Sequence, residues 1–335
     1  MNPQAGWHGV WAARGFWARL LWPVSCLYAA MLAVRRALYR WGVLRRVRLP
    51  VPVLVVGNVI VGGAGKTPVA IELALRLVAL GWCVGLVSRG HGRQSDAVMA
   101  VSDKTPPALV GDEPVLIHDR TGLPVVVGRD RVQAAQALLA SHPQVNLILS
   151  DDGLQHQRLW HDAALCVFDP RRIANGWLLP AGPLREPWPL QTPAPHTWIL
   201  SSETPPWAGA WPVLRTLSDT ARNGRGATIP LRELPGPIHA LAGIAQPERF
   251  FSALRDAGLS LDRTQAWPDH APMADWHAPA PGTWLCTEKD AVKLWAHHPE
   301  VWAVPLRVSL TDGLVHEIDR ALRAAQDRGQ NRPYH

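Results

Sequence analysis

The chain has 335 residues, 47% of them hydrophobic, and a formal net charge of +7 at pH 7. That length is enough for one large domain or two modest domains, each with its own core. The first fifty residues hold eight of the 34 Lys and Arg residues and no Asp or Glu, which leaves 26 basic against 27 acidic residues elsewhere. Because the rest of the chain is near neutral, the composition does not support a nucleic-acid-binding protein, and we expect no nucleic acid partner.

Cysteine and lysine are both rare in the chain. The four cysteines stand far apart and show no CxxC or Cys/His metal spacing: Cys26, Cys83, Cys166 and Cys286. This spacing indicates a reducing compartment without a disulfide framework. Beside thirty arginines there are only four lysines: Lys66, Lys104, Lys289 and Lys293. Each lysine is notable, because arginine cannot replace a lysine that acts as a compact point charge.

The N-terminal segment, residues 1–48, has the composition of a membrane-attached helix. Fifteen uncharged residues, 20–34, lie between arginines and are surrounded by Trp7, Trp11, Trp17, Trp22 and Trp41. Tryptophan favours the membrane–water interface, and arginine pairs with anionic headgroups. We therefore expect a helix lying in the cytoplasmic face of the inner membrane. A signal peptide, a single membrane span and a helix packed on the protein's own core are the alternatives.

A nucleotide-binding segment follows. Residues 52–57 form a short apolar run typical of a buried parallel strand, and residues 71–80 have the apolar spacing of a helix that ends at Gly81. Between them lies a glycine-rich turn that ends in Gly-Lys-Thr, which is the P-loop arrangement, although Ile60 stands where the strict pattern has its first glycine. We expect ATP phosphates to be held by Gly62, Gly63, Ala64, Gly65, Lys66, Thr67 and Pro68.

A magnesium site is predicted next to this turn. Residues 145–152 form an apolar strand that ends in two carboxylates, and ligands bind at the carboxyl ends of strands in open α/β sheets. Thr67 and either Asp151 or Asp152 would hold Mg²⁺, with Glu113 as a further candidate for the metal shell. A tight turn is the alternative explanation for Asp-Asp-Gly.

Further strands are predicted at residues 83–88, 98–101, 124–127 and 163–168, and helices at 113–119 and 131–140. Their alternation predicts an α/β fold of the P-loop NTPase type, with a mostly parallel sheet and helices on both faces. This kinase core is expected over residues 49–201 and an irregular linker over 202–235. A smaller C-terminal α/β domain is expected over 236–328, with strands at 238–243, 284–287 and 301–308 and helices at 247–257 and 314–325.

Six motifs in order resemble the tetraacyldisaccharide 4'-kinase family, from the N-terminal Trp/Arg helix to about residue 310. They are GNVIVGGAGKTP, SRGHGR, GDEP, SDDGLQHQRL, LLPAGPLREP and TEKDAVKL. His91 stands where the family usually has tyrosine, and Leu154 where it often has phenylalanine. The resemblance implies transfer of the ATP γ-phosphate to the 4'-hydroxyl of an acylated disaccharide 1-phosphate lipid, giving lipid IVA, in a two-domain protein with the nucleotide in the cleft.

The resemblance also implies residue roles. Asp112 corresponds to the family's catalytic aspartate and His270 to the histidine that supports it, beside Lys66 of the P-loop. A carboxylate near a sugar hydroxyl can orient that hydroxyl and accept its proton. The acceptor-lipid site is expected at Arg89, Arg129, Gln155, His156 and Arg185. For Thr287-Glu-Lys-Asp290, the sequence leaves two interpretations open: a helix start capped by Thr287, or a nucleotide contact.

Two other classes of protein compete with the kinase. One is a P-loop GTPase or ATPase of the metallochaperone or targeting type, which needs a metal-ligand cluster or a base-specificity motif. Neither is found, since Lys289 and Asp290 are adjacent rather than separated by one residue. The other is a membrane-associated nucleotide switch without a lipid acceptor, which would not need Asp112. A kinase explains more of the motifs than either alternative.

Overall fold

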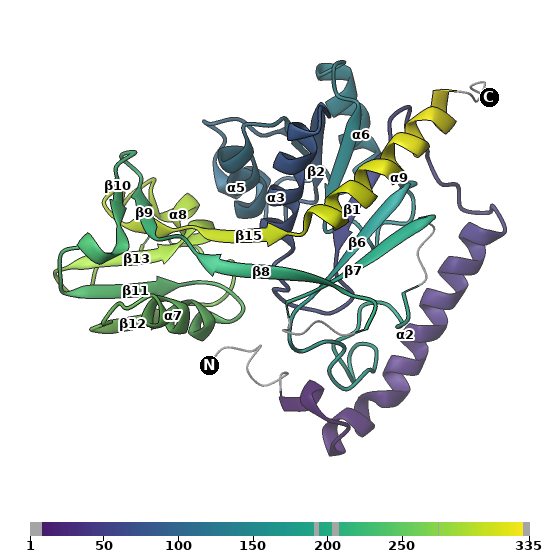
Figure 1. Cartoon of the computed structure of the whole chain (residues 1–335). Helices are drawn as coiled ribbons and strands as arrows, with labels where there is room; N and C mark the ends of the chain where they lie inside the picture. The colour runs from purple at the N-terminus through teal and green to yellow at the C-terminus, as the bar shows by residue number, and fades with distance from the viewer. Residues whose placement is uncertain (1–8, 191–193, 203–207, 274, 331–335) are drawn as a thin grey trace.

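The computed structural model describes residues 9–190, 194–202, 208–273 and 275–330. Within these residues the strands form two sheets, one of nine strands and one of six. Figure 1 shows a larger body and a smaller body side by side, with strands β8 and β15 running from one to the other. We call the two parts the larger body and the smaller body.

The larger body is built on the nine-stranded sheet. Neighbouring strands are parallel except for the pairs β15–β8 and β4–β3, so the sheet is mostly parallel, as predicted. Its order is β15 (Leu306–Leu310), β8 (Trp211–Leu217), β7 (His196–Ser201), β6 (Ala163–Phe168), β1 (Val53–Gly57), β5 (Leu147–Asp151), β2 (Val84–Ser88), β4 (Val125–Val127) and β3 (Met99–Ala100).

Helices cover both faces of this sheet, because alternate residues of its buried strands point to opposite sides. In β1, Leu54 and Val56 join one apolar core, while Val53 and Val55 join the other. The first core includes residues of α3 (Lys66–Ala79), α5 (Asp112–Thr121) and α9 (Asp312–Gln330), with the short α4 (Pro107–Val110) beside α5. The second core includes residues of α6 (Arg131–Ser141).

The smaller body is built on the six-stranded sheet. Its order is β10 (Thr228–Pro230), β9 (Thr220–Asn223), β14 (Trp302–Val304), β13 (Thr283–Thr287), β11 (Ile238–Ala242) and β12 (Arg263–Ala266), and a 3₁₀ turn, η1, covers Leu231–Glu233. Side chains of α7 (Pro247–Asp256) pack with Ala240 and Ala242 on one face. Those of α8 (Glu288–Leu294) pack with Leu241 on the other.

The predicted division of the chain needs correction. Residues 202–235 are not an irregular linker, since they contain β8, β9 and β10. Nor do residues 236–328 form one contiguous unit. The predicted strand 301–308 is divided at Pro305 into β14, in the smaller body, and β15, in the larger body. The following helix α9 also packs on the larger body. β8 gives little sequence signal: its apolar residues 211–214 are interrupted by Pro212, and one of its seven residues is buried.

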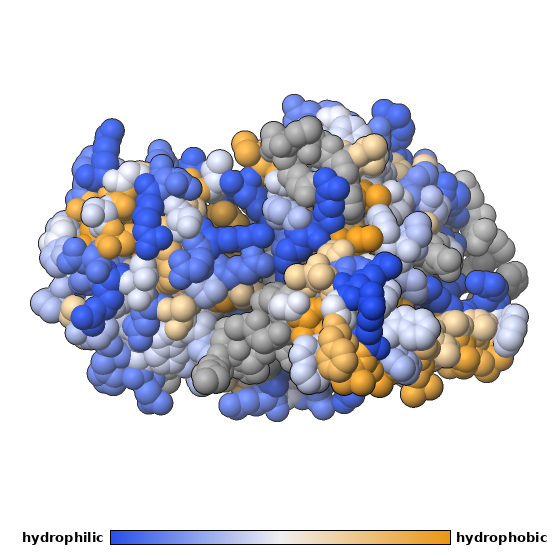
Figure 2. Space-filling model, turned by 90° about the horizontal axis from the view of Figure 1, so that it is seen from below, coloured by the Kyte–Doolittle hydropathy of each residue, from blue (hydrophilic) through white to orange (hydrophobic). Residues whose placement is uncertain are grey.

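The N-terminal helix α2 (Phe16–Arg40) lies along the outside of the larger body (Figure 1). Its buried residues Ala18, Ser25 and Leu32 recur every seven positions and form one narrow stripe. In the described part of the chain, α2 is the one helix long and apolar enough to cross a membrane. Most of its large apolar side chains are exposed: Phe16, Trp17, Leu20, Trp22, Val24, Leu27, Met31 and Val34. Figure 2 shows apolar surface gathered at one margin of the molecule.

Candidate active site

The P-loop lies between β1 and α3, as its sequence pattern predicts. Val61 donates its backbone N–H to the carbonyl of Pro183 at 2.9 Å, and Ile60 forms an isolated bridge with Leu184. Ile60 is 1% exposed and sits in extended backbone beside another segment, so this position does not require the glycine of the strict pattern. The turn proper then runs from Gly62 into α3, which begins at Lys66.

Asp151, at the carboxyl end of β5, lies directly beside the start of α3. The Thr67 hydroxyl donates to Asp151 Oδ2 at 3.3 Å, while the buried Asp151 Oδ1 has no hydrogen-bond partner. Burial, and then the charges of Glu113 and Asp152, raise the pKa of Asp151 to about 7. An unsatisfied buried carboxylate oxygen beside a threonine hydroxyl fits Mg²⁺, a hard cation that takes few protein oxygens and completes its shell with phosphates and water.

Asp152 is engaged differently from its neighbour. Its carboxylate accepts hydrogen bonds from both terminal nitrogens of Arg185, at 2.8 and 3.2 Å, and lies 3.7 Å from Lys66 Nζ. Burial opposes ionisation, but Lys66 and Arg185 hold the pKa of Asp152 far below its usual range. The Asp152 carboxylate therefore helps to position the Lys66 side chain, and Arg185 forms an ion pair with the same carboxylate.

Asp112 and His270 meet across the two bodies. Asp112 is the first residue of α5 and 5% exposed, whereas His270 follows β12 and has a positive φ of 60°. His270 Nδ1 lies 3.1 and 3.2 Å from the two carboxylate oxygens of Asp112, close enough to donate a hydrogen bond. The pair predicted by resemblance is therefore assembled in space, although 158 residues separate its members in sequence.

The charges around Asp112 keep it ionised. Burial alone would raise the pKa of Asp112, but the hydrogen bond with His270 and the charges of Lys289 and Lys293 lower it to about 2. The same hydrogen bond raises the pKa of His270, with burial and Lys289 opposing it. Lys289 Nζ lies 3.1 Å from His270 Nε2 and can donate there only if that nitrogen carries no proton. The Lys289 contact therefore requires a ring that carries its single proton on Nδ1, whereas the raised pKa of His270 favours protonation of both ring nitrogens.

Two lysines of α8 lie beside Asp112, a position that the sequence pattern did not predict for either. Lys289 Nζ contacts Asp269 at 2.9 Å and Glu113 at 3.4 Å, and Lys293 Nζ lies 3.7 Å from Asp112. Thr287 caps α8 by accepting from the Asp290 N–H, so the helix-start interpretation of this segment is confirmed. The scarcity of lysine was the available signal, since two of the chain's four lysines stand four residues apart here.

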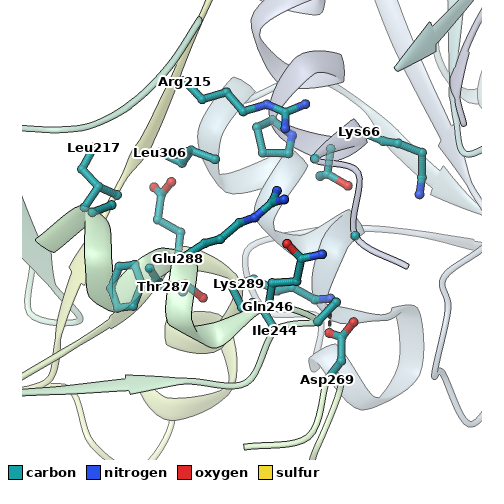
Figure 3. Close-up of a pocket in the computed structure, with 18 of the residues that line it drawn as sticks. Lys66, Arg215, Leu217, Ile244, Gln246, Asp269, Thr287, Glu288, Lys289 and Leu306 are labelled. Carbon is teal, nitrogen blue, oxygen red and sulfur yellow. Dashed lines mark hydrogen bonds and ion pairs between the residues drawn. The ribbon is translucent and has the colours of Figure 1, made fainter. Parts of the chain in front are cut away.

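A pocket of about 520 Å³ lies between the two bodies. Its polar end carries Lys66, Thr67 and Glu113, and Figure 3 shows Asp269 and Lys289 joined at its rim. Its apolar wall comes from the connecting strands and the smaller body: Leu217, Ile244, Phe250, Ala253, Val304 and Leu306. A P-loop at one end and an apolar slot at the other suit the phosphates and the base of a nucleotide.

A second hollow, of about 280 Å³, is lined by the loop that carries His91. His91 packs edge-on against the His270 ring, with ring centroids 4.9 Å apart, and lines this hollow with Arg89 and Arg129. Gly90 allows the loop to come this close, since a Cβ there would meet the Val110 carbonyl oxygen at 2.4 Å. The Asp112–His270 pair is thus flanked by two hollows, one lined by the P-loop and one by arginines.

The remaining predicted acceptor residues lie elsewhere. Gln155 donates to the Asn58 carbonyl at 3.1 Å, and Arg185 donates to the same oxygen at 3.0 Å, so both brace the segment after β1. His156 lies 3.6 Å from Asp130, and burial, followed by the charge of Arg131, lowers its pKa to about 4. Arg89 and Arg129 are therefore brought together, while Gln155 and Arg185 support the nucleotide side.

Three features define a P-loop phosphotransferase: the mostly parallel sheet, the P-loop, and two carboxylates, Asp112 at the start of α5 and Asp151 at the end of β5. The model of the family LpxK, tetraacyldisaccharide-1-P 4'-kinase, matches residues 17–323. Because that match covers most of the chain, the chain belongs to the tetraacyldisaccharide 4'-kinase family.

Individual relatives agree with this assignment. The chain is 47% identical over 326 residues to the tetraacyldisaccharide 4'-kinase of Acidovorax sp. (strain JS42), covering 96% of this chain and 95% of that one. It is 48% identical over 306 residues to that of Polaromonas naphthalenivorans (strain CJ2), covering 89% of each. The crystal structure of LpxK from Aquifex aeolicus in complex with ATP superposes with a TM-score of 0.79 at 28% identity, covering 92% of this chain and 100% of that one. These findings do not favour a nucleotide switch or metallochaperone.

Proposed function

We propose that Asp112, supported by His270, is the catalytic carboxylate of a kinase that transfers the ATP γ-phosphate to the 4'-hydroxyl of a tetraacyldisaccharide 1-phosphate. The observation that supports this most strongly is the position of the pair. Asp269 precedes His270 in the chain and Lys289 contacts its ring, and both residues line the nucleotide pocket. His91 packs on His270 and lines the second hollow, which we call the arginine hollow. A phosphoryl group passing between the two hollows would pass this carboxylate.

The chemistry follows from the charges. Phosphoryl transfer passes through a loose transition state, so positioning and electrostatic stabilisation contribute most of the catalysis. Because the pKa of Asp112 is about 2, its carboxylate is ionised at neutral pH and is a weak base. It orients the acceptor hydroxyl and takes its proton late, as the oxygen–phosphorus bond forms. His270 holds the carboxylate in place through Nδ1, and Lys289 fixes the ring from the other side.

On the donor side, separate residues are proposed to hold the phosphates and the metal. The P-loop backbone and Lys66 hold the phosphates, and Asp152 with Arg185 orients Lys66. Thr67 and Asp151 would hold Mg²⁺, which neutralises the charge on the β- and γ-phosphate oxygens when bound. We assign the metal to Asp151 rather than Asp152, because the Asp151 oxygen is unsatisfied and the Asp152 oxygens are not. Glu113 stands at the same end of the pocket.

On the acceptor side, Arg89 and Arg129 are proposed to receive the lipid's sugar phosphate. Arg129 is exposed, and its partner Asp96 is 3.8 Å away, so both arginines remain accessible for an incoming anion. Planar guanidinium groups match the geometry of phosphate oxygens. The His91 ring lines the same hollow as these arginines.

The test is transfer of labelled γ-phosphate from ATP to a tetraacyl disaccharide 1-phosphate in mixed micelles. We expect a labelled lipid that carries the new phosphate on the 4'-oxygen. A folded protein that binds ATP but yields no labelled lipid would contradict the kinase and would favour a nucleotide switch.

We also propose that α2 attaches the enzyme to the cytoplasmic face of the inner membrane, where anionic lipids and ATP are both available. Its exposed face is apolar, and the exposed Arg19 and Arg40 are available for headgroups, while Arg35 and Arg36 bind the Gln155 carbonyl and Glu186. The opposite face docks on the active-site loops: Ser25 donates to the Leu178 carbonyl at 2.8 Å, and Tyr28 to the Arg185 carbonyl at 3.0 Å. Such docking would place the arginine hollow at a fixed position relative to the bilayer.

Vesicle co-sedimentation tests the attachment. Replacing Leu20 and Leu27, both exposed on α2, with Asp should release the protein from phosphatidylglycerol-containing vesicles while leaving ATP binding intact. Leu214→Asp, at an exposed leucine on β8, is the matched control and should sediment as wild type. Undiminished sedimentation of the double variant would contradict attachment through this face.

A further inference from the structure

Arg215 extends from the connecting strand β8 to the P-loop. In β8, Arg215 and Leu217 are two residues apart, so they point to the same face of the strand, and both line the nucleotide pocket. Figure 3 shows the Arg215 side chain reaching from its strand across the pocket toward the start of α3. An arginine on a connection between two bodies is thus aimed at the phosphate-binding turn.

The guanidinium packs directly on the turn. Arg215 Nη2 donates to the Ala64 carbonyl at 2.7 Å. A Cβ on Gly65 would lie 2.8 Å from the guanidinium carbon, and Gly65 also has a positive φ of 69°. Gly65 is therefore required both by its backbone conformation and by the arginine stacked on it.

The positive charge of Arg215 is not neutralised by an ion pair. Asp169, whose charge raises the pKa of Arg215, is already bound by Arg171 at 2.8 Å and approached by Arg249 at 3.8 Å. In the described part of the chain, Arg215 forms no salt bridge, and its buried Nε has no hydrogen-bond partner. Burial accordingly lowers the pKa of Arg215.

A largely buried, unneutralised guanidinium is unfavourable unless an anion joins it. The anion that this pocket admits is the nucleotide, and the turn beneath Arg215 is the part of a P-loop that holds the β- and γ-phosphates. We propose that Arg215 is a nucleotide-binding residue that contacts these phosphates from β8, on a side of the turn that Lys66 does not cover. Because β8 also leads into the smaller body, the contact ties the phosphates to the strand that joins the two bodies.

The experiment compares Arg215→Gln and Arg215→Lys with Arg307→Gln. Arg307 is the matched control, since it lies on the paired strand β15, is exposed, and binds Asp219 at 3.1 Å away from the P-loop. Binding of ATP, ADP and AMP is measured by calorimetry on the full chain, together with the thermal midpoint. Loss of a charge-assisted hydrogen bond predicts roughly 10- to 100-fold weaker binding of ATP and ADP to Arg215→Gln.

AMP separates phosphate binding from a structural role, because it lacks the β- and γ-phosphates. Its affinity should be unchanged in Arg215→Gln, Arg215→Lys should recover part of the ATP affinity, and Arg307→Gln should bind all three nucleotides as wild type. ATP affinity like that of wild type in folded Arg215→Gln would overturn the proposal. So would an equal loss of AMP and ATP affinity that follows the fall in thermal midpoint. If Arg215→Gln does not fold, wild-type ATP and ADP affinity in Arg215→Lys would overturn it too, because a single ammonium cannot reproduce the guanidinium fork.

Discussion

The two halves of the active site are assembled in different ways. The nucleotide half comes from adjacent segments at one edge of one sheet: β1, the turn, the start of α3, and the end of β5 beside them. The half around Asp112 combines α5 of the larger body with the segment after β12 and with α8 of the smaller body. The groups proposed to hold the phosphates and Mg²⁺ lie within the larger body, although the smaller body adds apolar wall to the nucleotide pocket. The half around Asp112 exists only when the two bodies are in contact.

This difference has a functional consequence. Substitutions in the nucleotide half should affect ATP and Mg²⁺ binding directly. Substitutions in the half around Asp112 should affect turnover with little change in ATP affinity, because they act on the orientation of the acceptor. Substitutions between the bodies should reduce both stability and turnover.

A large effect is expected at the metal position. Asp151→Asn removes the unsatisfied carboxylate oxygen proposed for Mg²⁺, so at limiting Mg²⁺ activity should fall about 10²- to 10³-fold and recover partly at high Mg²⁺. Asp152→Asn, its neighbour, should lower activity without changing the Mg²⁺ concentration needed for half-maximal rate, since that carboxylate serves Lys66 and Arg185. Mg²⁺ titrations of both variants test this, and a shifted requirement in Asp152→Asn alone would reverse the assignment.

A smaller effect is expected at the supporting histidine. His270→Ala removes the hydrogen bond to Asp112, and we expect kcat to fall roughly 10- to 100-fold with the KM for ATP unchanged. His277→Ala is the control, because His277 is exposed, its Nδ1 hydrogen-bonds to the Asp275 carbonyl, and its ring packs edge-on against His298. Steady-state kinetics separate kcat from KM. A raised KM for ATP with kcat intact would place His270 in the nucleotide half.

The smallest effect on catalysis, but a measurable loss of stability, is expected between the bodies. Arg120 on α5 donates to both carboxylate oxygens of Glu288 on α8, at 2.7 and 2.6 Å, and Glu288 is 7% exposed. Arg120→Ala should lower the free energy of unfolding by about 2–4 kcal/mol, because it leaves a buried carboxylate with the weaker contact to Arg222 alone. Turnover should fall severalfold.

Urea unfolding measures that loss, and Arg307→Ala provides the comparison. Arg307 pairs with Asp219 on the surface, with both side chains exposed, so its removal should cost about 0.5 kcal/mol or less. Equal costs for the two variants would mean that the α5–α8 contact does not hold the bodies together.

Sequence reasoning succeeded where a local pattern carries the structure. The run at residues 52–57, the Gly-Lys-Thr turn and the helix after it are contiguous, so strand, P-loop and helix were all predictable. β8 was not, since Pro212 interrupts its apolar residues and one of its seven residues is buried. Arg215 was missed for the same reason.

The half around Asp112 could be reached only through family resemblance. His270 has no local feature that distinguishes it from thirteen other histidines, because its role depends on a contact formed 158 residues away. For the segment with Lys289, the sequence left a helix start and a nucleotide contact open; the helix start is correct, but neither interpretation placed Lys289 and Lys293 beside Asp112. Contacts between bodies leave no periodicity in the sequence.

The most direct test of the division between the two halves is the phosphotransfer kinetics of Asp112→Asn beside Lys66→Ala, with ATP affinity measured separately. Our account predicts that Asp112→Asn binds ATP as wild type while kcat falls about 10²- to 10⁴-fold, and that Lys66→Ala loses both affinity and turnover. Near-normal turnover in Asp112→Asn would remove this carboxylate from the mechanism and contradict the account.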